Sequence, residues 1–228
     1  MRSQALAQSN ATFMSRVYFW MMLGLLISGC VAFTFGNSPT LINAVYSNQI
    51  LWIGLIVLQF AAVIGLSAFI HKMSLALTMF VYIAYAALTG VTFSTIFLVF
   101  TRQSITEVFF ITSFAFIGLS AFGFLTKRDL GPLGSFCMTG LFGLIGFILI
   151  TFLFPSIMTT AVSMTINTLA ILIFAGLTAY DTQRIKQFNP AYAPADVAQK
   201  AAITGALMLY LDFINLFLNL LQLLGEKK

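Results

Sequence analysis

Two long stretches of this chain carry no charged residue, and they limit what it can fold into. They run from Val17 to Ile70 and from Leu130 to Tyr180. A helix needs about 20 apolar residues to cross the hydrocarbon core of a bilayer, so each stretch is long enough for two crossings. The chain is 60% hydrophobic and 7% charged, whereas about 25% of the residues in a soluble domain are charged. The sequence therefore predicts an all-α, polytopic membrane protein with a single membrane domain.

Turn-forming residues divide the two stretches. Residues 36–39 and 46–49 interrupt the first and residues 154–156 the second, because Pro and small polar side chains favour turns over a continued helix. Seven transmembrane helices are predicted, with the last helix central in the bundle. They span residues 17–35, 50–70, 74–100, 108–125, 135–154, 160–180 and 201–224. We expect a cytoplasmic N-terminal tail over residues 1–16, a membrane domain over 17–225 and a short C-terminal tail over 226–228.

The basic residues indicate how the chain is oriented. The net charge is +5, but Lys and Arg are scattered at the ends of apolar runs and form no basic stripe, so no nucleic-acid partner is expected. Cytoplasmic loops are enriched in Lys and Arg, and seven spans place alternate loops on opposite sides. One side collects eight basic residues, namely Arg2, Arg16, Lys72, Lys127, Arg128, Arg184, Lys186 and Lys200. The other side has three, Arg102, Lys227 and Lys228, which predicts a cytoplasmic N-terminus.

Two acids in or beside apolar spans are the strongest functional signal. Asp181 follows the sixth span, and Asp212 lies within the last. A carboxylate inside a bilayer is costly and usually has a partner, a water-filled cavity or an ion. Two such acids in contact would share a proton and respond to pH, because they resist ionising together, or they would bind a hard cation such as Ca²⁺. The contact requires either that the last span begin on the cytoplasmic side of the interface or that the sixth span keep Asp181 well inside it, which residues 182–186 would do by continuing the helix. The alternative is that Asp181 only forms an ion pair with Arg184 or Lys186.

Polar side chains also form stripes at helical spacing. On the last span, Asp212, Asn215, Asn219 and Gln222 share one helix face that lipid would not tolerate. A second stripe follows the third span, and its members are Thr78, Tyr82, Tyr85, Thr89 and Thr92. The two stripes could line one pathway, or they could hold helices together by hydrogen bonds worth about 1 kcal/mol each. For the third span alone, the second interpretation is favoured.

Small residues inside the spans are interpreted as packing residues. Gly allows helix backbones to approach closely, and the two Cys residues show no CxxC spacing that would indicate a metal site or a redox motif. These residues are Gly118, Gly123, Gly140, Gly143, Gly146, Cys30 and Cys137. We expect close helix contacts at the glycines and small core side chains at the cysteines.

Three segments carry a resemblance to a known family. GLTAYDTQRIK (176–186), TKRDL (126–130) and ALMLYLDFINLFL (206–218) resemble the bacterial branch of the Bax inhibitor-1 family, and the likeness extends from about Arg16 onward. It implies a bundle in which six helices surround the last one, and a pH-sensitive Ca²⁺ leak that the acid pair controls. Some members carry a basic residue in the second helix; here residues 50–70 contain Gln59 but no Lys or Arg.

These patterns favour a passive cation leak in the bacterial inner membrane, with Ca²⁺ as the ion conducted or bound. Asp181 and Asp212 would be the pH sensor, the gate and the Ca²⁺ ligands. Asn215, Asn219, Tyr82, Tyr85 and Thr89 are candidates for lining the pathway. The bilayer, Ca²⁺ and protons are the expected partners. No cofactor is expected. Enzyme activity is not expected either, since HExxH, GxSxG and Walker patterns are missing from the sequence.

Two other functions are compatible with the sequence. Other bacterial relatives regulate a membrane-anchored ATP-dependent protease, and eukaryotic relatives suppress cell death. A regulatory protein would bind such a protease through its N-terminal tail and loops. A proton-coupled transporter is less favoured, because neither a clear inverted repeat nor a pair of broken helices is visible.

Overall fold

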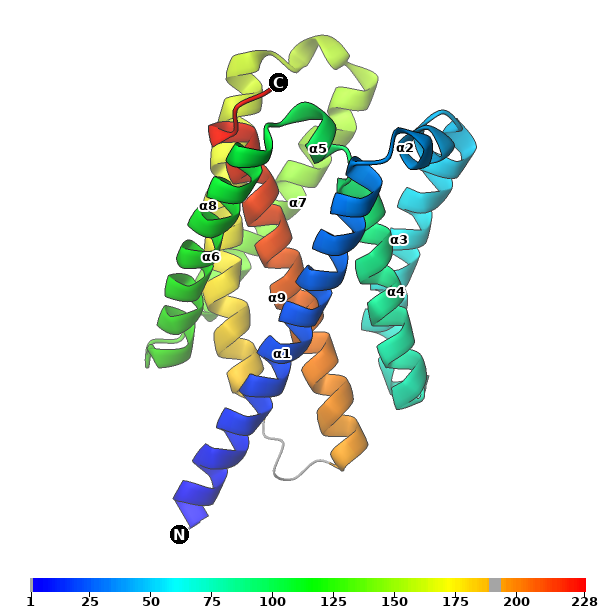
Figure 1. Ribbon diagram of the computed structural model, residues 1–228. Helices are drawn as coiled ribbons and strands as arrows, with labels where there is room; N and C mark the ends of the chain where they lie inside the picture. Colours follow the sequence, from blue (N-terminus) through cyan, green and yellow to red (C-terminus); the bar gives the residue numbers. More distant parts are fainter. Residues whose placement is uncertain (1, 189–193) are drawn as a thin grey trace. The chain divides into compact units, whose positions relative to one another are not determined.

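The computed structural model describes residues 2–188 and 194–228, and these residues are almost entirely helical (Figure 1). In the described part of the chain, seven helices are long and apolar enough to cross a membrane. This confirms the prediction of an all-α, polytopic membrane protein. The chain packs as two compact units, which are described separately.

The first unit comprises residues 1–101, 188–210 and 227–228. Its elements are α1 (Arg2–Gly36), α2 (Pro39–Tyr46), α3 (Gln49–Phe69), η1 (Ile70–Lys72), α4 (Leu75–Phe93), α5 (Ile96–Val99) and the first part of α9 (Ala195–Leu224). Helices α1 and α4 lie side by side over much of their length, and α3 packs on α4 (Figure 1).

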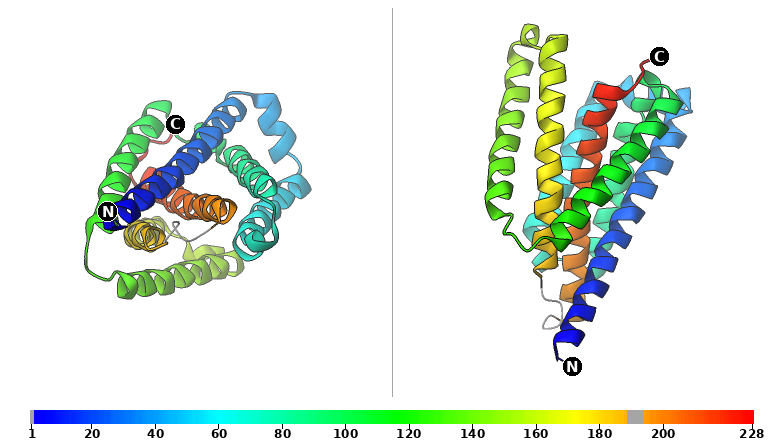
Figure 2. Two further views of the ribbon diagram at one scale, coloured as in Figure 1. Left: turned by 90° about the horizontal axis from the view of Figure 1, so that it is seen from below. Right: turned by 90° about the vertical axis from the view of Figure 1, so that its left-hand side faces the viewer.

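The second unit comprises residues 102–187 and 211–226. It contains α6 (Arg102–Leu125), α7 (Gly131–Leu153), η2 (Pro155–Ile157), α8 (Thr160–Lys186) and the second part of α9. Helix α8 packs against both α6 and α7, and Figure 2 shows α7 and α8 running side by side from their shared turn. An apolar cluster fills this unit, with Cys137 and Leu144 from α7, Phe174 and Leu177 from α8, and Leu216 from α9.

The predicted breaks act largely as helix caps. The Asn48 side chain accepts hydrogen bonds from the backbone N–H groups of Ile50 and Leu51, which begins α3. Ser38 caps α2 in the same way, with Pro39 in the first turn, where its missing N–H costs nothing. The sequence interpretation missed α2, whose eight residues run from the last residue of one predicted turn to the first residue of the other.

The third predicted span also differs from the structure. It was expected to run over residues 74–100, but α4 ends at Phe93 and a separate turn, α5, follows. The hydroxyl groups of Ser94 and Thr95 bond the carbonyl oxygens of Val91 and Thr92, at 2.6 and 3.1 Å. Ser and Thr bonds of this kind compete with helix continuation and account for the interruption.

The last helix is the most buried of the seven. In its most apolar window 67% of residues are buried, against at most 33% in any other candidate span of the described chain. It begins at Ala195, earlier than the predicted start at residue 201. Its first part belongs to the first unit and its second part to the second, so it contributes to both cores.

Candidate functional site: an acid pair on α8 and α9

Helix α8 continues through residues 182–186, which is one of the two arrangements expected to allow contact between the acids. Three members of the Tyr-Asp-Thr-Gln segment, residues 180–183, hold this end of α8 in place. The Tyr180 ring lies where a Cβ on Gly134 of α7 would be only 2.5 Å away. The Thr182 hydroxyl is 3.0 Å from the Ser120 hydroxyl of α6. Both neighbouring helices therefore fix the rotation of α8.

Gln183 ties α8 to the connection between α6 and α7. Its side-chain oxygen accepts from the Leu130 N–H at 2.9 Å, and its nitrogen donates to the Arg128 carbonyl at 2.8 Å. The side chain is buried, and the loop backbone supplies partners for both ends of the amide. Asp181 thus directly precedes two residues, Thr182 and Gln183, whose side chains form hydrogen bonds with neighbouring segments.

The carboxyl groups of Asp181 and Asp212 are close enough to interact electrostatically. Arg184, one turn further along α8, also interacts electrostatically with Asp181, and its side chain is exposed. Lys186, the other expected ion-pair partner, donates instead to the Phe124 carbonyl at 2.5 Å and lies over the Phe124 ring. An ion pair at 3.8 Å joins Lys200 to Asp196 on α9.

Asp212 is 4% exposed, and its Oδ2 atom has no hydrogen-bond partner among the described residues. On the neighbouring turn of α9, Phe213 packs edge-on against Phe109 and Phe116 of α6. A buried carboxylate oxygen without a partner is costly. A proton, a water molecule or a cation would satisfy it.

The polar stripe of α9 leads away from Asp212. The side-chain nitrogens of Asn215 and Asn219 donate to backbone carbonyls one turn earlier, at 2.8 and 2.7 Å. Because these bonds fix the orientation of both amides, the side-chain oxygens point away from the helix backbone. Both Asn side chains are partly exposed and Gln222 is exposed, although α9 is otherwise mostly buried. The stripe is therefore accessible along its length and ends at the buried acid.

The stripe on α4 lies in the first unit and is closely packed. Thr78, Tyr82, Tyr85 and Thr89 are all buried. The Tyr82 hydroxyl donates to the Trp20 carbonyl of α1 at 2.8 Å, whereas Thr89 donates to the Tyr85 carbonyl within α4 at 2.9 Å. The bond of Tyr82 favours the interpretation that this stripe holds helices together. The pathway-lining role predicted for these residues stays a prediction.

Gln59, the polar residue inside α3, is also engaged with α4. Its side-chain nitrogen donates to the Leu88 carbonyl at 3.1 Å and to the Thr92 hydroxyl. Helix α3 is the least buried candidate span of the described chain, at 6%. A hydrogen-bonded Gln thus occupies the middle of the helix in which some members of the family carry a basic residue.

The acid pair supplies part of a cation site. Two carboxylates balance the charge of one Ca²⁺, and the unpartnered oxygen of Asp212 suits a hard ion. Ca²⁺ takes six to eight oxygen ligands, and the described residues contain no group of three or more His, Cys, Asp or Glu side chains. Any further ligands would have to be water, amide or carbonyl oxygens.

Sequence reasoning missed a supporting residue of this site, Ser120 of α6, whose hydroxyl lies 3.0 Å from the Thr182 hydroxyl. In the first unit it also missed the buried hydrogen bond between Ser28 and Tyr210. Apolar composition conceals such residues, because Ser and Tyr are ordinary components of membrane helices.

The fold defines a polytopic, all-helical membrane protein with one acid, Asp212, buried in its last helix. Residues 10–228 match the family described as Inhibitor of apoptosis-promoting Bax1, and the chain belongs to this Bax inhibitor-1 family. It is 40% identical to the inner membrane protein YbhL of Escherichia coli K12 over 232 residues, covering 100% of this chain and 98% of YbhL. It is 36% identical over 217 residues to a protein of Borreliella burgdorferi, covering 95% of this chain and 92% of that protein. It is 35% identical to YrjE of Lactococcus lactis over 218 residues, covering 93% of this chain and 90% of YrjE.

Proposed function

We propose that this protein is a pH-sensitive, passive cation leak of the bacterial inner membrane, that Ca²⁺ is the conducted ion, and that Asp181 and Asp212 form its gate. The observation that carries the proposal is the electrostatic interaction of the two carboxyls, one of them buried with an unpartnered oxygen. Carboxylates that interact at low dielectric constant resist ionising together. Their charge changes with pH, and the change alters both cation affinity and helix contacts.

The α9 stripe supports a route for the ion. Asn215 and Asn219 present oxygens at helical spacing between the exposed Gln222 and the buried Asp212. Oxygen ligands without a fixed positive charge favour cations over anions, and only the last position carries a full negative charge. In this proposal cations reach the pair along the stripe, and the pair decides whether they pass.

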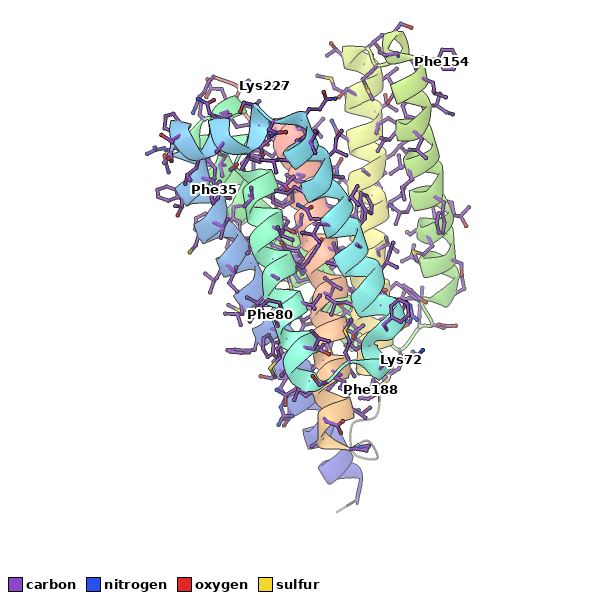
Figure 3. All side chains as sticks on the ribbon, turned by 90° about the vertical axis from the view of Figure 1, so that its right-hand side faces the viewer. Phe35, Lys72, Phe80, Phe154, Phe188 and Lys227 are labelled. Atoms are coloured by element: carbon purple, nitrogen blue, oxygen red, sulfur yellow. The ribbon has the colours of Figure 1, made fainter. Side chains whose placement is uncertain are left out.

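The distribution of charge supports a cytoplasmic N-terminus. In the second unit, contacts of Gln183 and Lys186 bring the basic loop residues Lys127 and Arg128 to the same end as Arg184. In the first unit, Lys72 and Phe188 lie toward one end and Phe35 and Lys227 toward the other (Figure 3). The ends rich in Lys and Arg would face the cytoplasm. The inner-membrane location rests on the seven apolar helices and on the similarity to YbhL.

Ca²⁺ flux into proteoliposomes tests the route. With wild-type protein we expect a leak that depends on pH and that protein-free liposomes lack. Asn219→Leu removes one oxygen of the stripe and should lower the flux about fivefold, equivalent to about 1 kcal/mol of lost polar contact. The matched control is Ser113→Leu, which replaces a partly exposed polar residue on α6. Absence of a leak with wild-type protein would reject the proposed function, and equal flux in the two variants would remove the stripe from the route.

A further inference from the structure

Within the second unit, helix α6 contacts both acid-bearing helices at the residue that follows each acid. We propose that Ser120 of α6 is a positioning residue, which keeps Asp181 turned toward Asp212 through its hydrogen bond with Thr182. This inference rests on the proposed role of the acid pair, but not on which ion the protein conducts. All of these residues belong to the second unit, and Ser120 belongs to neither polar stripe.

The bond between α6 and α8 has a defined direction. The Thr182 hydroxyl donates to the Thr178 carbonyl of its own helix at 2.7 Å. A threonine hydroxyl has one proton, so when Thr182 donates to Thr178, Ser120 must be the donor in the 3.0 Å bond between the two hydroxyls. Both side chains are buried, where the loss of a partner is costly. The bond therefore fixes which side of α8 faces α6, at the residue that follows Asp181.

The other acid-bearing helix meets α6 through aromatic rings. Phe213, which follows Asp212 on α9, lies edge-on to Phe116 and Phe109 of α6, with centroid distances of 5.5 and 5.7 Å. Ser120 and Phe116 are four residues apart, which places them on the same side of α6. The residue after each acid is thus held by the same helix, and α6 is the common reference for the rotation of α8 and of α9.

The directions of the three helices bring the two acids toward each other. Thr182 and Lys186 both bond the last part of α6, in the same order along the chain, so α8 runs parallel to α6. Helix α9 runs antiparallel to α6, because Glu226 at its end bonds Ser104 near the start of α6. Each acid precedes its contact with α6 by one residue, which is about 100° of rotation and about 1.5 Å of rise. In helices of opposite direction these offsets have opposite senses, so both acids are displaced toward each other along the α6 axis.

The position of Asp181 therefore depends on the rotation of α8. At a side-chain radius of about 5 Å, a rotation of about 30° moves a carboxyl group by about 3 Å, which is the length of a hydrogen bond. The Oδ2 atom of Asp212 has no hydrogen-bond partner among the described residues that would draw it after Asp181. Tyr180 and Gln183 hold α8 against α7 and the loop. Helix α8 thus stays in place when the Ser120 hydroxyl is removed, but it loses the contact that turns Asp181 toward Asp212.

The other ionisable groups of the second unit are not moved relative to Asp181 by this bond. Arg184 interacts with Asp181 and is on the same helix, so a rotation of α8 moves both together. Lys186, further along α8, bonds a backbone carbonyl of α6, and α7 presents the Cys137 thiol to α8. The remaining charged residues are on α6, on its connection to α7 and at the end of α9, and they are Arg102, Glu107, Lys127, Arg128, Asp129 and Glu226. A change in how the pair titrates when the bond is removed would therefore report mainly the separation of the two acids.

Infrared titration of the full-length protein in liposomes tests the inference. The carboxyl band of the pair is assigned by its loss in Asp181→Asn and Asp212→Asn. In Ser120→Ala we expect the midpoint of this band to move to lower pH by about 0.5 to 1 unit, because separated acids repel each other less. Thr182→Val should give the same shift, and the double variant no further shift, because both changes remove one bond. Thr182→Ser keeps the hydroxyl and should keep the wild-type midpoint.

Thr112→Val is the matched control, because the buried Thr112 hydroxyl of α6 donates to the Val108 carbonyl of its own helix at 2.7 Å. This variant should leave the midpoint unchanged. A midpoint at or above the wild-type value in Ser120→Ala, or an equal shift in Thr112→Val, would overturn the inference. If Ser120→Ala does not fold, the comparison of Thr182→Val with Thr182→Ser decides, because it changes the same bond from the side of α8.

Ca²⁺ flux is measured separately on the same samples. A wild-type protein without flux would reject the proposed leak, whereas the infrared midpoints would still show whether Ser120 positions Asp181.

Discussion

Single side chains decide how the acid-bearing end of α8 is held, and Gln183 makes the largest contribution. Its buried amide bonds the loop at both Arg128 and Leu130. We predict that Gln183→Ala destabilises the protein by about 1 to 3 kcal/mol, because loop groups lose their partners. Thermal unfolding in detergent measures the change. Gln187→Ala, an exposed position one turn later, serves as control; equal unfolding temperatures for the two variants would contradict this assignment.

At the same scale, the sequence identified the two acids but not the side chains that support them. Asp181 and Asp212 could be predicted because a charge within or beside apolar spans is rare and costly. Ser120 could not, because it is an ordinary residue until its partner on α8, Thr182, is known. Spacing along one helix also could not distinguish the two polar stripes. The stripe on α4 is closed by hydrogen bonds within the first unit, whereas the amide oxygens on α9 remain accessible.

Among the helices, α6 and α8 come closest to each other at a glycine. A Cβ on Gly123 would collide with the Ala179 carbonyl, whereas a Cβ on Gly118 of the same helix would meet nothing within 4 Å. We predict that Gly123→Ala destabilises the protein by about 1 to 3 kcal/mol through overpacking. Gly118→Ala should be neutral or stabilising by up to about 1 kcal/mol, from helix propensity. Denaturant unfolding of both variants provides the measurement, and a reversed order would show that this contact is misplaced.

The sequence could predict that glycines matter for helix packing, but not which ones. Gly123 and Gly140 face other helices, whereas Gly118, Gly143 and Gly146 face open space. The cysteines divide in the same way, because Cys137 is buried and Cys30, expected in the core, is exposed. In a membrane helix both the lipid face and the packed face are apolar, so composition does not distinguish them. Helix α2 was missed for a related reason, since short turns and short helices share the same capping residues.

For the whole molecule, the strongest prediction is the orientation of the chain. In the second unit, the basic connection after α6 and the turn around Phe154 lie at opposite ends of α7. In a background without Cys30 and Cys137, Lys127→Cys should react with an impermeant maleimide only from the cytoplasmic side, because basic loops face the cytoplasm. Ser156→Cys should react only from the outside. The opposite pattern would invert the proposed orientation.

The C-terminal residues belong to the same question. The Glu226 N–H donates to the Ser104 hydroxyl near the start of α6, and Lys228 bonds the carbonyls of Phe97 and Val99 in the first unit. These contacts place residues 226–228 at the end of α6 opposite to the basic loop that follows Leu125. An odd number of crossings places the two ends of the chain on opposite sides of the membrane. We therefore predict that Lys227→Cys reacts with the maleimide from the outside. Reaction from the cytoplasmic side would indicate that α9 does not cross.

The central claim is that two carboxyls, on α8 and on α9, respond to pH as one unit. The most direct measurement is the pH dependence of Ca²⁺ flux in proteoliposomes for Asp181→Asn, Asp212→Asn and the double variant. If the acids act as one unit, each single variant loses the pH dependence of the wild-type leak, and the double variant behaves like either one. If either single variant keeps the wild-type pH profile, the pair is not the gate.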